Sequence, residues 1–314
     1  MLRALTLFHA DPLSGEASDD ASKRLFSLAP KRLLAVADPR PVPVTDYFQR
    51  LAYWLHQPVP TPVAPVTAAM DLADFDPQAF WLRLDPVHLV PDRDTLVLFP
   101  AADVGMTEEE ALTLIEAFNH HFQADGIQLE YGAVDRWYVR MPQTVDIRSV
   151  PLPQAVGANL HTVQPQGSAV RYWNRLINEA QMLFFQHPLN QARREQGLPE
   201  INGLWLWGEG RLPEFVCRKG LCIVDPLEDP FLRALAGLIE ADYRTEAVSD
   251  FKQIEAEALF VRLDKGAEVS WDQVEALLRK KQVNEVLLDW GGEHAWYWQP
   301  GYLRRFWRRW FNSL

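Results

Sequence analysis

The chain has 314 residues, of which 31 are Lys or Arg and 42 are Asp or Glu, so its formal net charge is −11. Its hydrophobic share of 48% and charged share of 23% are typical of globular proteins and exclude a largely disordered chain. The acidic excess argues against a general nucleic-acid-binding protein, so no nucleic acid is expected as a partner. Twelve Trp residues are the unusual feature of this composition.

The cysteines and the apolar segments indicate the cellular compartment of the protein. Cys217 and Cys222 are the only cysteines, which rules out a disulfide framework and a four-cysteine zinc site. No stretch approaches the roughly 20 apolar residues that a membrane span needs. The apolar run after Met1 is interrupted by Thr6 and His9, which favours a first strand over a signal peptide. We therefore expect a cytoplasmic protein.

The N-terminal elements follow from hydrophobic patterning and from turn-forming residues. The pattern predicts a strand over 2–10, a loop over 11–20, and helices over 21–37 and 45–56. Prolines then stand at positions 58, 60, 62 and 65. Because proline lacks a backbone donor, this segment is expected to be a stiff extended connector at a boundary between two structural units.

Strands and two strong helices are predicted in the middle of the chain. Strands are expected over 80–84, 95–99 and 136–141, with residues 85–92 forming a connection. Thr107 and Glu110 form a capping box that begins the clearest helix. A second long helix is expected over 168–186, and it must end before Pro188.

The C-terminal third alternates strands and helices. Strand residues 202–207 lead into a turn flanked by Gly208 and Gly210. The elements predicted after it are a strand over 221–224, a helix over 230–241, a strand over 257–263, a helix over 270–281 and a strand over 285–290. Such alternation predicts an α/β protein with a parallel or mixed sheet covered by helices.

Two segments carry candidate ligand-binding groups, each with a structural alternative. Asp85 and His88 follow a predicted strand, where loops often carry function, but Asp85 could equally cap the turn while His88 packs locally. The Gly208–Gly210 turn offers backbone N–H groups of the kind that hold phosphate or carboxylate. It has neither a P-loop nor a dinucleotide fingerprint, so a simple tight turn is the alternative.

A polar row lies on the predicted helix over 168–186. Asn174, Asn178 and Gln181 recur at i, i+4 and i+7 beside a face of aromatic and aliphatic residues. These amides could form a buried network that ties the helix to loops, or they could line a ligand pocket.

The last residues, 301–314, form a basic and aromatic amphipathic pattern. Its apolar residues are Leu303, Phe306, Trp307, Trp310, Phe311 and Leu314, and its basic residues are Arg304, Arg305, Arg308 and Arg309. The pattern predicts a helix. It could dock a partner or contact a membrane surface, or it could pack on the acidic body of its own chain.

Three segments together resemble a known family. They are Trp81–Leu89, the stretch from Asn178 to Asn190, and Asn202–Gly210. They look like proteobacterial RpfE-type regulatory, or phosphoglycerate-mutase-like, proteins. These are similar to archaeal-type cofactor-independent phosphoglycerate mutases, in the segment inserted into their alkaline-phosphatase-like core. The resemblance covers roughly residues 80–210.

This resemblance implies a fold and a domain organisation. Residues 1–76 and 205–314 would form a reduced alkaline-phosphatase-like sheet with helices on both faces, and residues 77–204 would form an inserted α+β unit. The candidate ligand-binding residues in the resembling segments are Arg83, Asp85, His88, Asn178, Gln181, Asn202, Gly208 and Gly210.

The resemblance also implies what the parent enzymes need, which is two divalent ions, a Ser nucleophile, and Asp and His ligands. Asp11 stands near the family's Asp-Gly position, and Asp289 and His294 stand near its Asp-His pair, although four residues separate them. No Asp-Ser dipeptide is present. The core therefore looks degenerate.

The leading hypothesis is a non-catalytic regulatory or binding protein that has no resident cofactor. It would recognise a protein partner or a small anionic metabolite. The alternative is a phosphoglycerate mutase or phosphatase that uses Mn²⁺ or Mg²⁺ at Asp11, Asp289 and His294.

Overall fold

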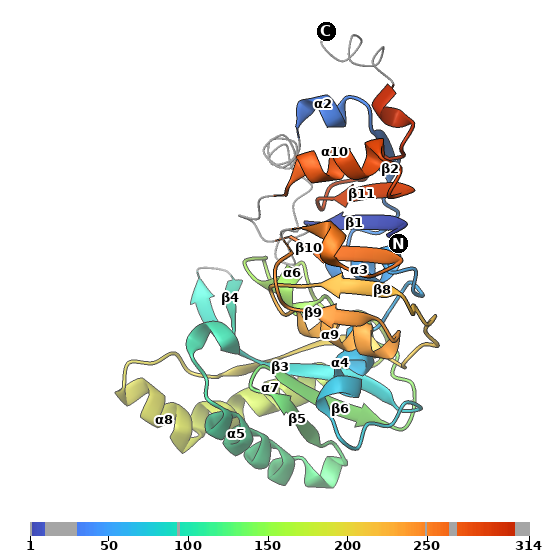
Figure 1. The fold of residues 1–314 in the computed structure, drawn as a ribbon. Coiled ribbons are helices and arrows are strands. Elements are labelled where there is room, and N and C mark those ends of the chain that lie inside the picture. The colour runs from blue at the N-terminus through green and yellow to red at the C-terminus, as the bar shows by residue number, and fades with distance from the viewer. Residues whose placement is uncertain (1, 10–29, 93–94, 249, 264–268, 305–314) are drawn as a thin grey trace. The chain divides into compact units, whose positions relative to one another are not determined.

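A computed structural model describes residues 2–9, 30–92, 95–248, 250–263 and 269–304 (Figure 1). The chain divides into two compact units, residues 1–61 with 214–314, and residues 62–213. The first division falls inside the proline-rich segment. The boundary expected between residues 204 and 205 lies within strand β7 (Gly203–Gly210), which pairs with a strand of the second unit and belongs to it.

The first unit contains a seven-stranded mixed sheet with the order β2-β12-β11-β1-β10-β8-β9. Its strands are β1 (Ala4–Phe8), β2 (Asp38–Pro41), β8 (Leu221–Val224), β9 (Asp242–Arg244), β10 (Ala258–Arg262), β11 (Glu285–Asp289) and β12 (His294–Trp298). The five strands from β11 to β9 are parallel, β12 runs antiparallel to β11, and β2 runs antiparallel to β12. The central strands are buried and almost continuously apolar, as parallel strands covered on both faces should be.

Helices cover both faces of this sheet. They are α2 (Lys31–Leu34), α3 (Tyr47–Trp54), α9 (Pro230–Leu238) and α10 (Trp271–Arg279), with 3₁₀ turns at Phe251–Gln253 and Tyr302–Arg304. Leu5 and Leu7 of β1 pack with residues of α2 and α10. Phe8, which points to the opposite face, contacts Tyr47 of α3. The predicted α/β class, with helices on both faces, is confirmed.

The second unit is an α+β insertion built on an antiparallel sheet (Figure 1). Its strands are β3 (Phe80–Asp92), β4 (Thr95–Pro100), β5 (Leu129–Ala133), β6 (Arg136–Met141) and β7. Its helices are α4 (Val63–Asp71), α5 (Glu108–His121), α6 (Leu152–Ala155), α7 (Val170–Gln186) and α8 (Pro188–Glu195), with 3₁₀ turns at Ala101–Val104 and Gln123–Asp125. One core joins α5 and α7 to the sheet, and a smaller one joins α4 to Trp81 and Tyr138.

The strongest local signals are confirmed in the second unit. Thr107 and Glu110 make the reciprocal capping box at the start of α5. The long helix α7 ends at Gln186, and Pro188 begins α8, where its missing N–H costs no intrahelical hydrogen bond.

Two predictions about proline are wrong. The segment after Pro62 is the helix α4, which accommodates Pro65 in its first turn. Residues 85–92 continue strand β3 and form no loop. On one side β3 pairs with β6 over 80–83 and with β4 over 87–92, so Pro86 stands where the ladder on that side is interrupted. A proline is tolerated in a strand at such a point.

Candidate functional site

Asp289 ends strand β11 at the carboxyl edge of the parallel sheet, and it is fully buried. Its Oδ2 accepts hydrogen bonds from Arg50 Nε at 3.0 Å and from Trp54 Nε1, both on α3. Its Oδ1 accepts from Arg50 Nη2 and from the backbone N–H of Gly291 at 3.0 Å. Arg50 is only 2% exposed and also donates to the carbonyl oxygen of Gly292 at 2.9 Å. The carboxylate is thus neutralised by a guanidinium group and accepts four hydrogen bonds.

A second buried carboxylate lies at the same edge of the sheet. Asp225 follows β8 and accepts hydrogen bonds from Arg262 Nη1 at 3.2 Å and from the Tyr243 hydroxyl at 2.9 Å. The Asp225 carboxylate also accepts hydrogen bonds from backbone N–H groups of the following loop, including that of Asp229 at 2.7 Å. Asp229 accepts a hydrogen bond from the Tyr47 hydroxyl at 2.9 Å, and burial raises the pKa of Tyr47 well above its usual value.

These donor sets do not fit the divalent ions that the family resemblance implies. An ionised carboxylate offers about four lone-pair sites, and N–H donors already use those of Asp289. A guanidinium beside it also repels a cation. Within the described residues, no cluster of three or more His, Cys, Asp or Glu side chains could hold a metal ion.

Two of the three predicted metal ligands lie in the part of the chain that the structure describes, and they differ in exposure. His294 begins β12 and is exposed, whereas Asp289 is buried against α3. Asp11 lies outside the described residues.

Arg83 and Asp85 form a buried ion pair on one face of β3. Arg83 Nε and Nη2 donate to the two carboxylate oxygens at 2.9 and 2.6 Å, and Trp207 Nε1 of β7 donates to Oδ2 at 2.6 Å. The guanidinium also lies 4.5 Å from the centroid of the Trp207 ring. Burial raises the pKa of Asp85 to about 6, although Arg83 and Trp207 lower it. The pair is satisfied internally and has a structural role.

The raised pKa of Asp85 predicts a pH dependence of stability. Because the pKa rises from 3.8 to about 6, the folded protein keeps this proton over a range in which the unfolded chain has released it. The contribution of Asp85 to the free energy of unfolding is fully present below the pKa that this carboxyl has in the unfolded chain, and it is lost as the pH rises through about 6. Over that range we expect the unfolding free energy of the wild type to fall by up to about 3 kcal/mol relative to that of Asp85→Asn.

Urea unfolding at several pH values measures this difference. Asp92→Asn, an exposed carboxylate on the same strand, serves as the control and should follow the wild-type profile. Parallel pH profiles for the wild type and Asp85→Asn would contradict the prediction.

Four other predicted ligand residues have structural partners. His88 Nδ1 lies 2.7 Å from the Glu200 carbonyl oxygen. The Asn202 carboxamide bonds both the N–H and the carbonyl oxygen of Leu89, at 2.7 and 2.9 Å. Gly208 and Gly210 have φ values of 72° and 155° and face the start of α4, where an added Cβ would crowd Ala64 and Pro62 respectively. These glycines make room for a helix.

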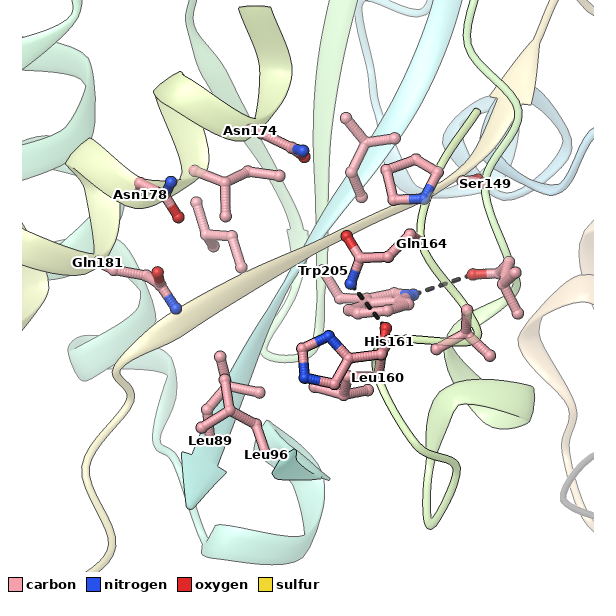
Figure 2. A pocket seen from close by; sticks show the side chains of 16 residues that line it. Leu89, Leu96, Ser149, Leu160, His161, Gln164, Asn174, Asn178, Gln181 and Trp205 are labelled. Carbon is pink, nitrogen blue, oxygen red and sulfur yellow. Dashed lines mark hydrogen bonds between the residues drawn. The ribbon is translucent and has the colours of Figure 1, made fainter. Parts of the chain in front are cut away.

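Asn178 and Gln181 line a cavity of about 590 Å³ in the second unit (Figure 2). Figure 2 shows them with Asn174 in a row along α7, across from Gln164 and His161. Trp205 of β7 lies among the other lining side chains and donates its indole N–H to the Val150 carbonyl oxygen at 2.9 Å. Of the candidate ligand residues, these two amides line this cavity.

The predicted partner or membrane surface lies mostly outside the described residues. This applies to Arg305, Trp307, Arg308 and Trp310, and Arg304 is described only by its backbone in a 3₁₀ turn. In the described part of the chain, no helix has the length and apolarity required to cross a bilayer.

Comparison of sequences finds phosphoglycerate mutases that are similar to part of this chain. A probable 2,3-bisphosphoglycerate-independent phosphoglycerate mutase of Geobacter sulfurreducens is 29% identical over 132 residues, which are 42% of this chain and 33% of that protein. An enzyme of the same name from Methanosarcina mazei is 23% identical over 112 residues, which are 35% of this chain and 28% of that protein. The chain matches about a third of the length of these curated relatives. The predicted resemblance to phosphoglycerate mutases is confirmed over these partial matches.

Comparison of structures adds two neighbours of low identity. A cofactor-independent phosphoglycerate mutase from Thermoplasma acidophilum has a TM-score of 0.45 at 14% identity, with coverage of 96% of this chain and 90% of that one. A Pyrococcus horikoshii protein has a TM-score of 0.49 at 13% identity, with coverage of 95% and 87%. No protein-family model matches the chain.

Sequence reasoning missed Arg50, Asp225 and Arg262. One signal was available for Arg50, because Tyr47, Arg50, Leu51 and Trp54 recur at i, i+3, i+4 and i+7. An arginine on the apolar face of a helix needs a buried acidic partner. The partner itself is 239 positions away, and only the fold identifies it.

Proposed function

We propose that this chain is a non-catalytic, phosphoglycerate-mutase-like binding protein. The observation that carries the proposal is the pairing of Asp289 with Arg50 at the carboxyl edge of the parallel sheet. In open α/β sheets this edge is the usual place for a functional site. Here its buried carboxylates are bound by arginines, so their lone pairs are unavailable to a metal ion or a substrate.

The arginines supply the positive charge that a cation would otherwise supply. Asp289 is held by Arg50, and Asp225 is held by Arg262. Unlike a bound metal ion, a guanidinium has no open coordination position, so it cannot lower the pKa of a bound water or hydroxyl and generate a nucleophile as a metal does. The arrangement preserves the structure of the sheet edge without the chemistry of a metal centre.

The proposal predicts no phosphoglycerate mutase or phosphatase turnover above the uncatalysed rate with Mn²⁺ or Mg²⁺. The assay uses the full chain with 2- and 3-phosphoglycerate and a general phosphatase substrate. A phosphoglycerate mutase of known activity, assayed in the same buffers, controls for the metal. Metal-dependent turnover that Asp289→Asn or His294→Ala abolishes would overturn the proposal.

The second candidate is a metal-dependent phosphoglycerate mutase or phosphatase that acts on a small phosphorylated metabolite. The observation that favours it is the sequence match to phosphoglycerate mutases over 132 residues. On this alternative Asp289 must leave Arg50 to bind Mn²⁺ or Mg²⁺. The same turnover assay separates the two candidates.

The finer proposal is an RpfE-type regulatory protein that acts in the cytoplasm. Its support is the set of motifs at Trp81–Leu89, Asn178–Asn190 and Asn202–Gly210. A protein partner, or a small anionic metabolite, is the proposed target. The basic residues in 301–314 are the proposed partner surface, and peripheral membrane contact is the less favoured use of them.

A further inference from the structure

The cavity beside α7 has an unusual combination of lining groups. Its 16 lining residues include no Asp, Glu, Lys or Arg (Figure 2). Apolar side chains make up most of the wall, among them Leu89 of β3, Leu204 of β7 and Ile177 of α7. A volume of about 590 Å³ is within the usual range for a small-molecule site.

The polar groups of the wall divide into those already bonded and those facing the cavity. The indole N–H of Trp205 is bonded to Val150, and Ser149 bonds Glu209 through both its backbone N–H and its hydroxyl. Gln164 Nε2 donates to the Leu160 carbonyl oxygen at 2.6 Å. By contrast, no hydrogen bond joins the carboxamides of Asn174, Asn178 or Gln181 to another described residue.

The row of carboxamides defines what the cavity can recognise. Each offers two N–H donors and one carbonyl acceptor, so it pairs best with a group that also offers both a donor and an acceptor. The one ionisable side chain in the wall is His161, and there is no Lys, Arg, Asp or Glu, so a charged ligand would lose its hydration without a permanent countercharge to compensate for that loss. The apolar remainder of the wall favours an apolar body.

We propose that this cavity binds an uncharged small molecule with an apolar body and an amide-like edge. The edge would pair with Asn174, Asn178 and Gln181, and the body would lie against Leu89, Leu204 and the ring of Trp205. This uncharged ligand differs from the protein partner or anionic metabolite proposed above, so the inference adds a binding site to the proposed function.

A matched pair of probes tests the charge selectivity, namely 4-phenylbutanamide and 4-phenylbutanoate. They share a carbon skeleton, and only the second is an anion at neutral pH. Ligand-observed NMR titration of the full chain should show the amide binding about ten-fold more tightly than the carboxylate or better, which corresponds to about 1.4 kcal/mol.

A double variant, Asn178→Ala with Gln181→Ala, tests the site. We expect it to weaken amide binding about five-fold or more, because each carboxamide contributes a hydrogen bond to the complex. Gln186→Ala is the matched control, since Gln186 is an exposed amide on the same helix that does not line the cavity. It should leave binding unchanged. Both sites of the double variant are at least partly exposed, so the fold should persist.

Three results would overturn the proposal: no binding of the amide, equal binding of the carboxylate, or unchanged amide binding by the double variant. This test is separate from the turnover assay. A protein without turnover that fails to bind the amide loses only this inference. A protein that binds the amide and turns over phosphoglycerate loses only the proposed non-catalytic function.

Discussion

Replacing Arg50 by methionine should lower the free energy of unfolding by about 3–5 kcal/mol, because Asp289 would then stay buried without its countercharge. Methionine retains much of the arginine stem, so the loss reports the charge and the hydrogen bonds more than the packing. The hydrogen bonds from Trp54 and Gly291 remain in the variant but carry no positive charge. Urea unfolding of the wild type and the variant measures the difference.

Arg32→Met is the matched control for this experiment. Arg32 also forms ion pairs in the first unit, with Asp272 at 3.1 Å and Glu275 at 3.2 Å, but its side chain is 54% exposed. Such an exposed pair contributes about 0–1 kcal/mol. Equal losses in the two variants would contradict the structural role assigned to Arg50. In the double variant Arg50→Met with Asp289→Leu, both charges are gone, and much of the lost stability should return.

Arg83→Met should produce a loss of similar size in the second unit, about 3–5 kcal/mol. The substitution leaves Asp85 fully buried with Trp207 Nε1 as its remaining side-chain donor. It also removes the guanidinium from the face of the Trp207 ring. The pKa of Asp85 should rise further, because the charge that opposes the effect of burial is removed.

Urea unfolding again provides the measurement, with Arg140→Met as the control. Arg140 lies on β6 of the same unit, and its half-exposed side chain is 3.8 Å from Glu130. Its replacement should change stability by less than about 1 kcal/mol. An Arg83→Met variant as stable as Arg140→Met would show that the buried pair contributes little.

Signals from neighbouring residues in the sequence were sufficient to predict much of the fold. The capping box at Thr107 and the periodicity of the helix before Pro188 depend on neighbouring residues, and both were confirmed. Strand β3 was predicted too short, because Pro86 is a strand breaker on local evidence alone. Strand β3 tolerates Pro86 because this residue falls in the gap between two partner strands, β6 and β4. The pairing of distant strands determines that gap.

The candidate site was less accessible to sequence reasoning for the same reason. Asn178 and Gln181 were identified because helical spacing put them on one face, and that face lines the cavity. Gly208 and Gly210 suggested a phosphate turn, but they accommodate α4, which begins more than 130 residues earlier. A sequence shows where a glycine stands, but it does not show which neighbouring segment would clash with a larger side chain there.

The position of β1 in the sheet has a consequence for the order of folding. This strand lies between β10 and β11, so Ala4–Phe8 pairs with residues 258–262 and 285–289. During synthesis from the N-terminus, β1 must wait for both partners until the ribosome has made most of the chain. The second unit is continuous in sequence and can complete its core earlier. Until then the first unit exposes an unpaired apolar strand, so slow translation or truncation near the C-terminus should favour aggregation through β1.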